Sequence, residues 1–189
     1  MTDTASHDAP ATAARNKELG LAEVPGDQSN VTAAVVTINK PAQELYDFWR
    51  DFSNLARVME NVENITVADR QRSTWQVKAP GDRTVQWDAL VTEDEPGRVI
   101  GWQSAEGSEI SHSGRVEFLE TPHRGTVVRV VIGYDVPGGA IGKIAAKLFQ
   151  REPAIQARRD LRRFKMFMET GEIATSARTR AHAAEHKAG

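Results

Sequence analysis

The chain has 189 residues, of which 40% are hydrophobic and 26% charged, and its formal net charge is −2. This composition suits one globular domain with a core, and no stretch approaches the roughly 18 consecutive apolar residues of a membrane span. Cysteine is absent, which excludes disulfides, cysteine nucleophiles and thiolate metal sites.

The two ends of the chain differ from the middle. Residues 1–28 are rich in Ala, Thr, Asp and Pro without a clean hydrophobic period, which predicts a disordered tail. They also lack a basic start followed by an apolar run, so we expect no signal peptide and a cytoplasmic protein. Residues 172–189 are polar and Ala-rich and predict a flexible or frayed tail. One domain is therefore expected over residues 29–171.

A strand and two short helices are expected first. Val31–Ile38 is a β-branched run typical of a strand. Pro41 stands where a proline at the first helical position belongs, with Glu44 in the first turn. A short second helix is predicted around Leu55–Met59.

Six strand-like segments follow, with turn signals between them. In Thr84–Thr92 apolar and polar residues alternate, which predicts one buried and one solvated face. Pro96-Gly97 predicts a type II turn after this strand. The predicted strands are Asn64–Ala68, Ser73–Lys78, Thr84–Thr92, Val99–Gln103, Ser111–Glu120 and Thr126–Val136. Since each later strand has one apolar face, we expect an antiparallel sheet covered on one side.

The C-terminal region can supply that cover. Ile141–Leu148 carries an apolar helical stripe, and Pro153 and Gly171 are placed to begin and end a long helix, Pro153–Thr170. We therefore predict an α+β fold, in which a curved antiparallel sheet wraps around the long C-terminal helix, with two short helices after the first strand. A cavity between sheet and helix is expected.

An ordered set of short motifs extends over residues 30–172. It comprises Pro41, Tyr46 and Trp49, then Trp75, Val85-Gln86-Trp87-Asp88, Glu93-Asp94-Glu95-Pro96-Gly97, Ile100-Gly101-Trp102-Gln103-Ser104, Gly114-Arg115-Val116-Glu117-Phe118, Gly125-Thr126-Val127-Val128, and Asp160-Leu161-Arg162-Arg163-Phe164-Lys165 with Met168–Glu172. The set resembles the START/Bet v 1-like (SRPBCC) superfamily, in particular its bacterial polyketide cyclase/dehydrase branch, which is related to coenzyme Q-binding START-type proteins. The resemblance implies a helix-grip fold and a hydrophobic cavity. Members bind lipids, quinones, hormones or polyketide intermediates, and only some catalyse a reaction.

Candidate ligand-binding residues share the inward parity of their strands. A buried tryptophan offers a large apolar area and an N–H for a ligand acceptor, although ordinary core packing is the alternative. His112 can orient a ligand carbonyl or act as an acid/base group, or it can be satisfied by water or backbone. The predicted lining is Trp75, Trp87, Trp102, His112 and Tyr134, with Phe164 and Met168 on the helical lid.

Other chemistries lack the residues they need. Of five histidines only His112 is on a predicted strand, so neither a metal site nor a cofactor is predicted. Ser111 and Ser113 have outward parity, and no Gly-x-Ser-x-Gly elbow is present. Four further outward residues are expected to form cross-strand charge pairs on the solvated face, each contributing little: Asp88, Arg115, Glu117 and Arg129.

Charge is distributed unevenly along the chain. Residues 29–140 have a net charge of −5 and residues 141–171 a net charge of +5. Five basic residues lie on the predicted C-terminal helix: Arg158, Arg159, Arg162, Arg163 and Lys165. They either complement their own domain or make a weak contact with an anionic membrane or an acidic partner. A pI near 6.2 argues against a nucleic-acid partner.

Three functions are consistent with these patterns. The first is a non-enzymatic carrier that binds a lipid, an isoprenoid quinone or a polyketide-like aromatic. The second is a metal-free cyclase or dehydratase, with His112 or Tyr134 as the acid/base group. The third is an accessory domain whose basic helix is the working surface. The small number of titratable groups on inward faces favours the first.

Overall fold

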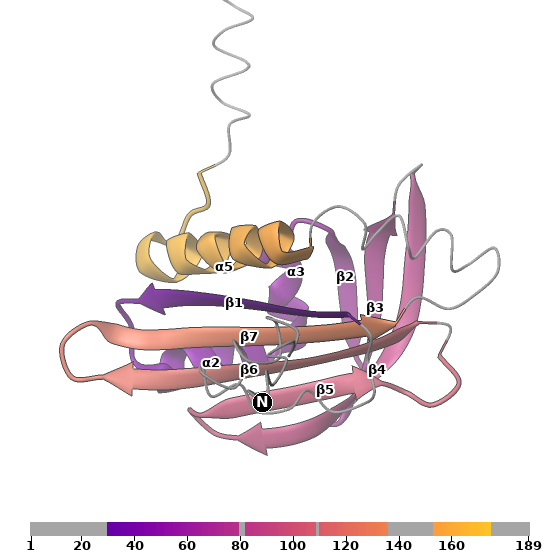
Figure 1. Ribbon diagram of the computed structural model, residues 1–189, viewed down its shortest axis with the longest axis horizontal. Helices are drawn as coiled ribbons and strands as arrows, with labels where there is room; N and C mark the ends of the chain where they lie inside the picture. Colours follow the sequence, from indigo (N-terminus) through magenta and orange to yellow (C-terminus); the bar gives the residue numbers. More distant parts are fainter. Residues whose placement is uncertain (1–29, 80–81, 109, 136–152, 175–189) are drawn as a thin grey trace, which may run out of the picture.

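The computed structural model describes residues 30–79, 82–108, 110–135 and 153–174. These residues form a curved antiparallel sheet with helices on its inner side, the predicted helix-grip arrangement (Figure 1). In chain order the elements are β1 (Asn30–Ile38), α2 (Ala42–Arg50), the 3-10 helix η1 (Phe52–Asn54), α3 (Leu55–Val58), β2 (Val62–Val67), β3 (Arg72–Ala79), β4 (Arg83–Glu95), β5 (Val99–Ser104), β6 (Ser111–Thr121), β7 (Gly125–Asp135) and α5 (Pro153–Thr170).

Most sequence-based boundaries agree with these elements to within three residues. Pro41 differs from its predicted place, because its backbone is extended (ψ 146°) and it occupies the N-cap, so the helix begins at Ala42. The type II turn at Pro96-Gly97 is confirmed. Gly97 has φ +70°, and Arg98 N donates to Glu95 O over 2.9 Å. The helical stripe predicted at Ile141–Leu148 lies outside the described residues.

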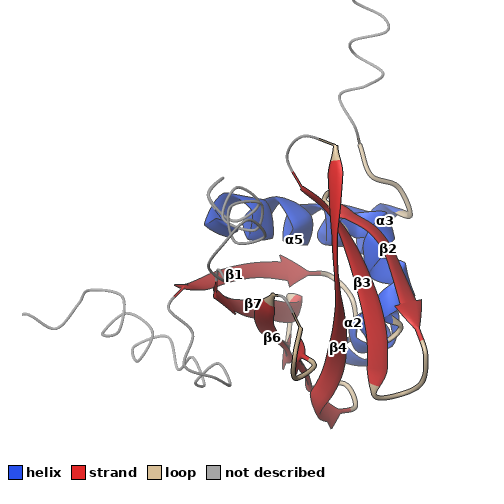
Figure 2. Cartoon of the chain, turned by 90° about the vertical axis from the view of Figure 1, so that its right-hand side faces the viewer, coloured by secondary structure: helices blue, strands red, loops and turns tan. Residues whose placement is uncertain are grey.

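The sheet has seven strands in the order β1-β7-β6-β5-β4-β3-β2, all antiparallel. Its bend is strong, with β2, β3 and β4 in one arm and β1, β7 and β6 in the other (Figure 2). The register places Trp75 opposite Trp87 and His112 opposite Tyr134. Residues from distant parts of the chain therefore meet on one inner face.

Helix α5 is held by the β1 and α3 side of this inner face. Lys165 Nζ donates to Thr37 O over 2.6 Å, and Arg163 Nε donates to Val58 O over 2.9 Å. Asp160, whose pKa burial raises to about 6, accepts from Glu60 N over 3.1 Å. Arg159 pairs with Glu60 at 3.3 Å. Arg158 Nε also donates to Ala154 O over 3.1 Å. Four of the five predicted surface cations thus bind groups of their own domain, although Arg158, Arg159 and Arg162 are exposed.

The outer face of the sheet carries the expected charged residues with one difference. Arg115 pairs with Glu93 at 2.7 Å and with Glu117, which also pairs with Arg129 at 3.2 Å. One expectation was wrong, the charge pairing of Asp88. Asp88 accepts a hydrogen bond from Thr74 Oγ1 over 2.7 Å instead of pairing with a cation. Ser113, which shares the outward parity, is 0% exposed, because strand parity sets the direction of a side chain and not what covers it.

Gly114 on β6 makes room for the indole of Trp102. A Cβ at this position would lie 2.1 Å from Trp102 Cζ2, much closer than real carbon atoms approach one another. Trp102 is 2% exposed and surrounded by packed residues, so it has little room to retreat. The absence of a side chain at position 114 is therefore a condition for the position of Trp102.

We expect Gly114→Ala to lower the free energy of unfolding by about 2–3 kcal/mol, the usual cost of overpacking a core. Urea denaturation at neutral pH measures it. Gly107→Ala is the control, since a Cβ there meets no atom within 4 Å and its cost of about 1 kcal/mol comes from φ +81° alone. Equal losses in the two variants would contradict the steric account of Trp102.

Candidate ligand-binding site

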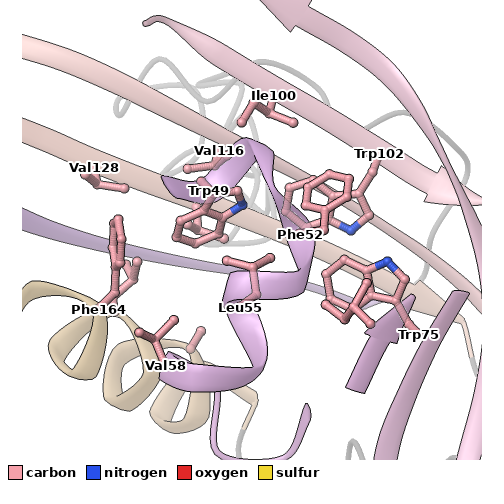
Figure 3. Packing of buried hydrophobic residues seen from close by; sticks show 14 of the residues in the cluster. Trp49, Phe52, Leu55, Val58, Trp75, Ile100, Trp102, Val116, Val128 and Phe164 are labelled. Carbon is pink, nitrogen blue, oxygen red and sulfur yellow. The ribbon is translucent and has the colours of Figure 1, made fainter. Parts of the chain in front are cut away.

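Three tryptophans from neighbouring strands form an offset stack on the inner face. The Trp75 ring centroid lies 6.2 Å from that of Trp87 and 6.2 Å from that of Trp102, with interplanar angles of 17° and 13°. All three side chains are buried, as the alternation of their strands predicts. Figure 3 shows Trp75 and Trp102 beside Phe52. Such pairs contribute about 0.5–1.5 kcal/mol each beyond the buried area.

His112 lies against all three tryptophans. Its ring centroid is 5.3 Å from Trp87, 6.4 Å from Trp75 and 6.5 Å from Trp102. Its main chain is fixed by Ser104, whose Oγ accepts from His112 N over 2.7 Å and donates to His112 O over 3.0 Å. The imidazole is thus held in place at the centre of an aromatic cluster, which we call the Trp–His cluster (Trp75, Trp87, Trp102 and His112).

Several polar atoms of this cluster are buried without a partner among the described residues. They are Nε1 of Trp87, Nε1 of Trp102 and Nδ1 of His112. Trp75 differs, because its Nε1 donates to Ser73 Oγ over 3.0 Å. Leaving a buried polar atom unpaired costs about 1–3 kcal/mol, so native proteins seldom do so without a reason. Trp49 Nε1, outside the cluster, is unpaired in the same way. Three such atoms within one cluster make the Trp–His cluster the candidate for a binding site.

The Trp–His cluster carries no charge at neutral pH. Burial lowers the pKa of His112 to about 4, because the cationic form would lose its hydration. Among the described residues, the buried polar side chains are those of Ser73, His112, Ser113 and Thr126. None of these carries a permanent charge. Tyr134, opposite His112 in the register, is also buried, and this raises the pKa of its hydroxyl.

The two residues predicted on the helical lid lie apart from the cluster. The ring centroid of Phe164 lies 5.2 Å from that of Trp49 and 5.4 Å from that of Phe48. Met168 is half-buried at the edge of the core. Within the described residues Phe164 makes no ring contact with Trp75, Trp87 or Trp102. The structure therefore divides the predicted lining into the Trp–His cluster with Tyr134 nearby, and a separate group under α5.

Sequence reasoning missed Phe52 and the network that positions it. The Phe52 ring lies 5.7 Å from Trp75 and 6.0 Å from Trp102. The guanidinium of Arg50 lies 5.9 Å from the Phe52 centroid and donates to Asp94 over 2.8 Å. Tyr46 Oη donates to the same carboxylate. Phe52 is apolar by its chemistry, but only the tertiary fold shows which strands it meets.

The described ranges contain neither a metal-ligand cluster nor a membrane-spanning helix. There, no three His, Asp or Glu side chains gather in a way that could hold a metal ion. None of the helices seen in these ranges has the length and apolarity needed to cross a membrane.

Comparison with known proteins gives one family and a set of solved structures. The family described as polyketide cyclase/dehydrase and lipid transport matches residues 38–162. DR_A0006 from Deinococcus radiodurans is 41% identical over 76% of this chain and 100% of that chain, with a TM-score of 0.62. TTHA0849 from Thermus thermophilus is 22% identical over 72% of this chain and 94% of that chain, with a TM-score of 0.60.

A third similar structure is the Zhui aromatase/cyclase from Streptomyces sp. R1128. It is 13% identical over 77% of this chain and 99% of that chain, with a TM-score of 0.58. At this identity the likeness shows the shared fold alone. No curated protein matches the chain.

The pKa of His112 makes stability depend on pH. In the folded protein the pKa of His112 is about 4, below the ordinary 6.5. The contribution of the neutral imidazole to the free energy of unfolding is therefore present above pH 6.5 and is lost as the pH falls toward 4. We expect His112→Gln to lack this loss, which amounts to about 3 kcal/mol for a shift of this size. Urea denaturation of both proteins between pH 7 and pH 4.5 measures the difference.

Two comparisons sharpen that experiment. Asp160 has a raised pKa and acts in the opposite direction, but it is present in both proteins, so their difference isolates His112. His123→Gln, at an exposed position in the β6–β7 turn, is the matched control and should behave like the wild type. Identical pH profiles for wild type and His112→Gln would contradict a buried, neutral imidazole.

Proposed function

The chain belongs to the family described as polyketide cyclase/dehydrase and lipid transport, and from this premise we propose that it binds a small hydrophobic ligand at the Trp–His cluster. The family supports a ligand-binding or cyclase role. The choice of this cluster as the site is our own. It rests on the unpaired nitrogens of Trp87, Trp102 and His112 inside an aromatic surface.

The aromatic surface and the unpaired nitrogens of the site have different uses in binding. Apolar surface contributes about 25 cal/mol per Å² removed from water, so stacked indoles supply most of the affinity. A few polar groups fix the orientation of the ligand. Flat rings contact a flat ligand more fully than a saturated chain, which favours a polyketide-like aromatic or a quinone over a simple acyl chain. The cavity expected between sheet and α5, the absence of a cofactor and the cytoplasmic location stay predictions.

A cyclase or dehydratase is the second candidate, and the pairing of His112 with Tyr134 favours it. These residues face each other in the β6–β7 register, so an imidazole and a phenol lie on adjacent strands. A neutral imidazole can accept a proton, and a phenol can donate one. The reaction would require both groups to reach the same substrate atoms.

The basic residues of α5 give weaker support to the third function, contact with an anionic membrane or an acidic partner. Arg159, Arg163 and Lys165 bind groups of their own domain. Arg158 also donates to Ala154 O over 3.1 Å. Arg158 and Arg162 are exposed, and their contact with an anionic membrane or an acidic partner stays a prediction.

We expect the purified protein to retain a hydrophobic molecule, visible by native mass spectrometry and identified after solvent extraction. Trp87→Ala should lose it, because this change removes ring surface beside His112. Leu119→Ala is the control, since Leu119 is 45% exposed on the outer face. Protein that is repeatedly empty, with tryptophan fluorescence unaffected by a panel of aromatic and quinone probes, would contradict the proposal.

The enzymatic candidate has its own test. If the site catalyses a cyclisation or dehydration of a polyketide-like substrate, His112→Ala and Tyr134→Phe should each abolish turnover while circular dichroism stays unchanged. Turnover that survives both substitutions would show that these two residues are not the acid/base groups.

A further inference from the structure

We propose that the Trp–His cluster recognises a neutral oxygen acceptor on a planar ring system, as in an aromatic ketone or quinone, and discriminates against anionic ligands of the same shape. Trp87 and Trp102 supply the N–H donors. This inference rests on the proposed function, because it specifies the chemistry of the ligand's polar end.

The donors determine which ligand group fits. An indole nitrogen only donates, so Trp87 and Trp102 both require an acceptor. Both rings lie within 6.5 Å of the His112 ring, centroid to centroid. The proposal therefore places the ligand oxygen beside His112, between these two rings. A carbonyl oxygen has two lone pairs and can accept from both, whereas a hydrocarbon leaves both unpaired at the full cost of their burial.

The surroundings determine the charge of that group. The buried polar side chains of the described residues are uncharged, so a carboxylate would lose its hydration without gaining a cation. Arg50 lies over the ring of Phe52, which contacts the stack. Its guanidinium is already occupied by Asp94 and by the carbonyl of Arg70. A neutral carbonyl avoids this cost.

Trp75 provides an internal control for the role of the N–H groups. It belongs to the same stack and is equally buried, yet its Nε1 already donates to Ser73 Oγ. Trp→Phe at any of the three positions removes similar ring area. Only at positions 87 and 102 does it remove a donor that is free for a ligand.

The experiment uses three nearly isosteric probes, 2-acetylnaphthalene, 2-ethylnaphthalene and 2-naphthoate, titrated calorimetrically into the full chain at pH 7.5. The ketone is expected to bind about tenfold more tightly than the hydrocarbon, since it satisfies donors that the hydrocarbon leaves unpaired. Naphthoate is expected to bind at least tenfold more weakly than the ketone.

Variants then assign the selectivity to individual nitrogens. Trp87→Phe and Trp102→Phe should each reduce the ketone-to-hydrocarbon ratio of affinities about threefold or more. Trp75→Phe should weaken both probes while leaving that ratio unchanged. The ratio is measured within one protein, so a general loss of stability does not alter it, and circular dichroism verifies the fold of each variant.

The outcomes separate this inference from the function on which it rests. Ketone and hydrocarbon binding with equal affinity would overturn the inference and leave a hydrophobic site in place. Naphthoate binding as tightly as the ketone would overturn it as well. If none of the three probes binds, both this inference and the proposed function fail. A ratio that falls equally in all three Trp→Phe variants would refute the assignment to Trp87 and Trp102.

Discussion

The offset stack of Trp75 with Trp87 and Trp102 is the constraint on which the inner face depends. Three large rings from β3, β4 and β5 can lie together only if the neighbouring strands leave space. Gly114 on β6 provides that space beneath Trp102, and η1 places Phe52 against the other side of the stack. The register supports the same arrangement, because Trp75 lies directly opposite Trp87 on the adjacent strand.

Burial without charge is the second property of this region. Among the described residues, the interior that surrounds the stack is apolar apart from indole N–H groups, hydroxyls and one histidine. His112 is neutral because burial removes the water that its cationic form would need. Charged groups are arranged instead on the outer face and at the α5–α3 contact, where Arg115, Glu117 and Arg163 have partners. The fold thus separates an uncharged inner face from a charged exterior.

The sequence predicts the fold more fully than it predicts the site. Alternation in β4 placed Trp87 inward, and the proline and glycine at 96 and 97 located a turn, because these signals are local. The contact between Phe52 and the stack joins an early helix to later strands, so no local pattern contains it. Phe164 lies on the predicted apolar face of its helix and meets Trp49, a partner that helix periodicity does not identify. That the N–H groups of Trp87 and Trp102 lack a partner can be recognised only from the structure, because it depends on which residues surround them in space.

The most direct test of the account is the indole ¹H–¹⁵N NMR spectrum of the four tryptophans during titration with 2-acetylnaphthalene. If a ligand carbonyl accepts from the free donors, the Nε1–H signals of Trp87 and Trp102 move downfield as the site fills. The Trp75 signal, already bonded to Ser73, changes little. Saturating binding that leaves the Trp87 and Trp102 signals in place would contradict the central claim that these nitrogens recognise the ligand.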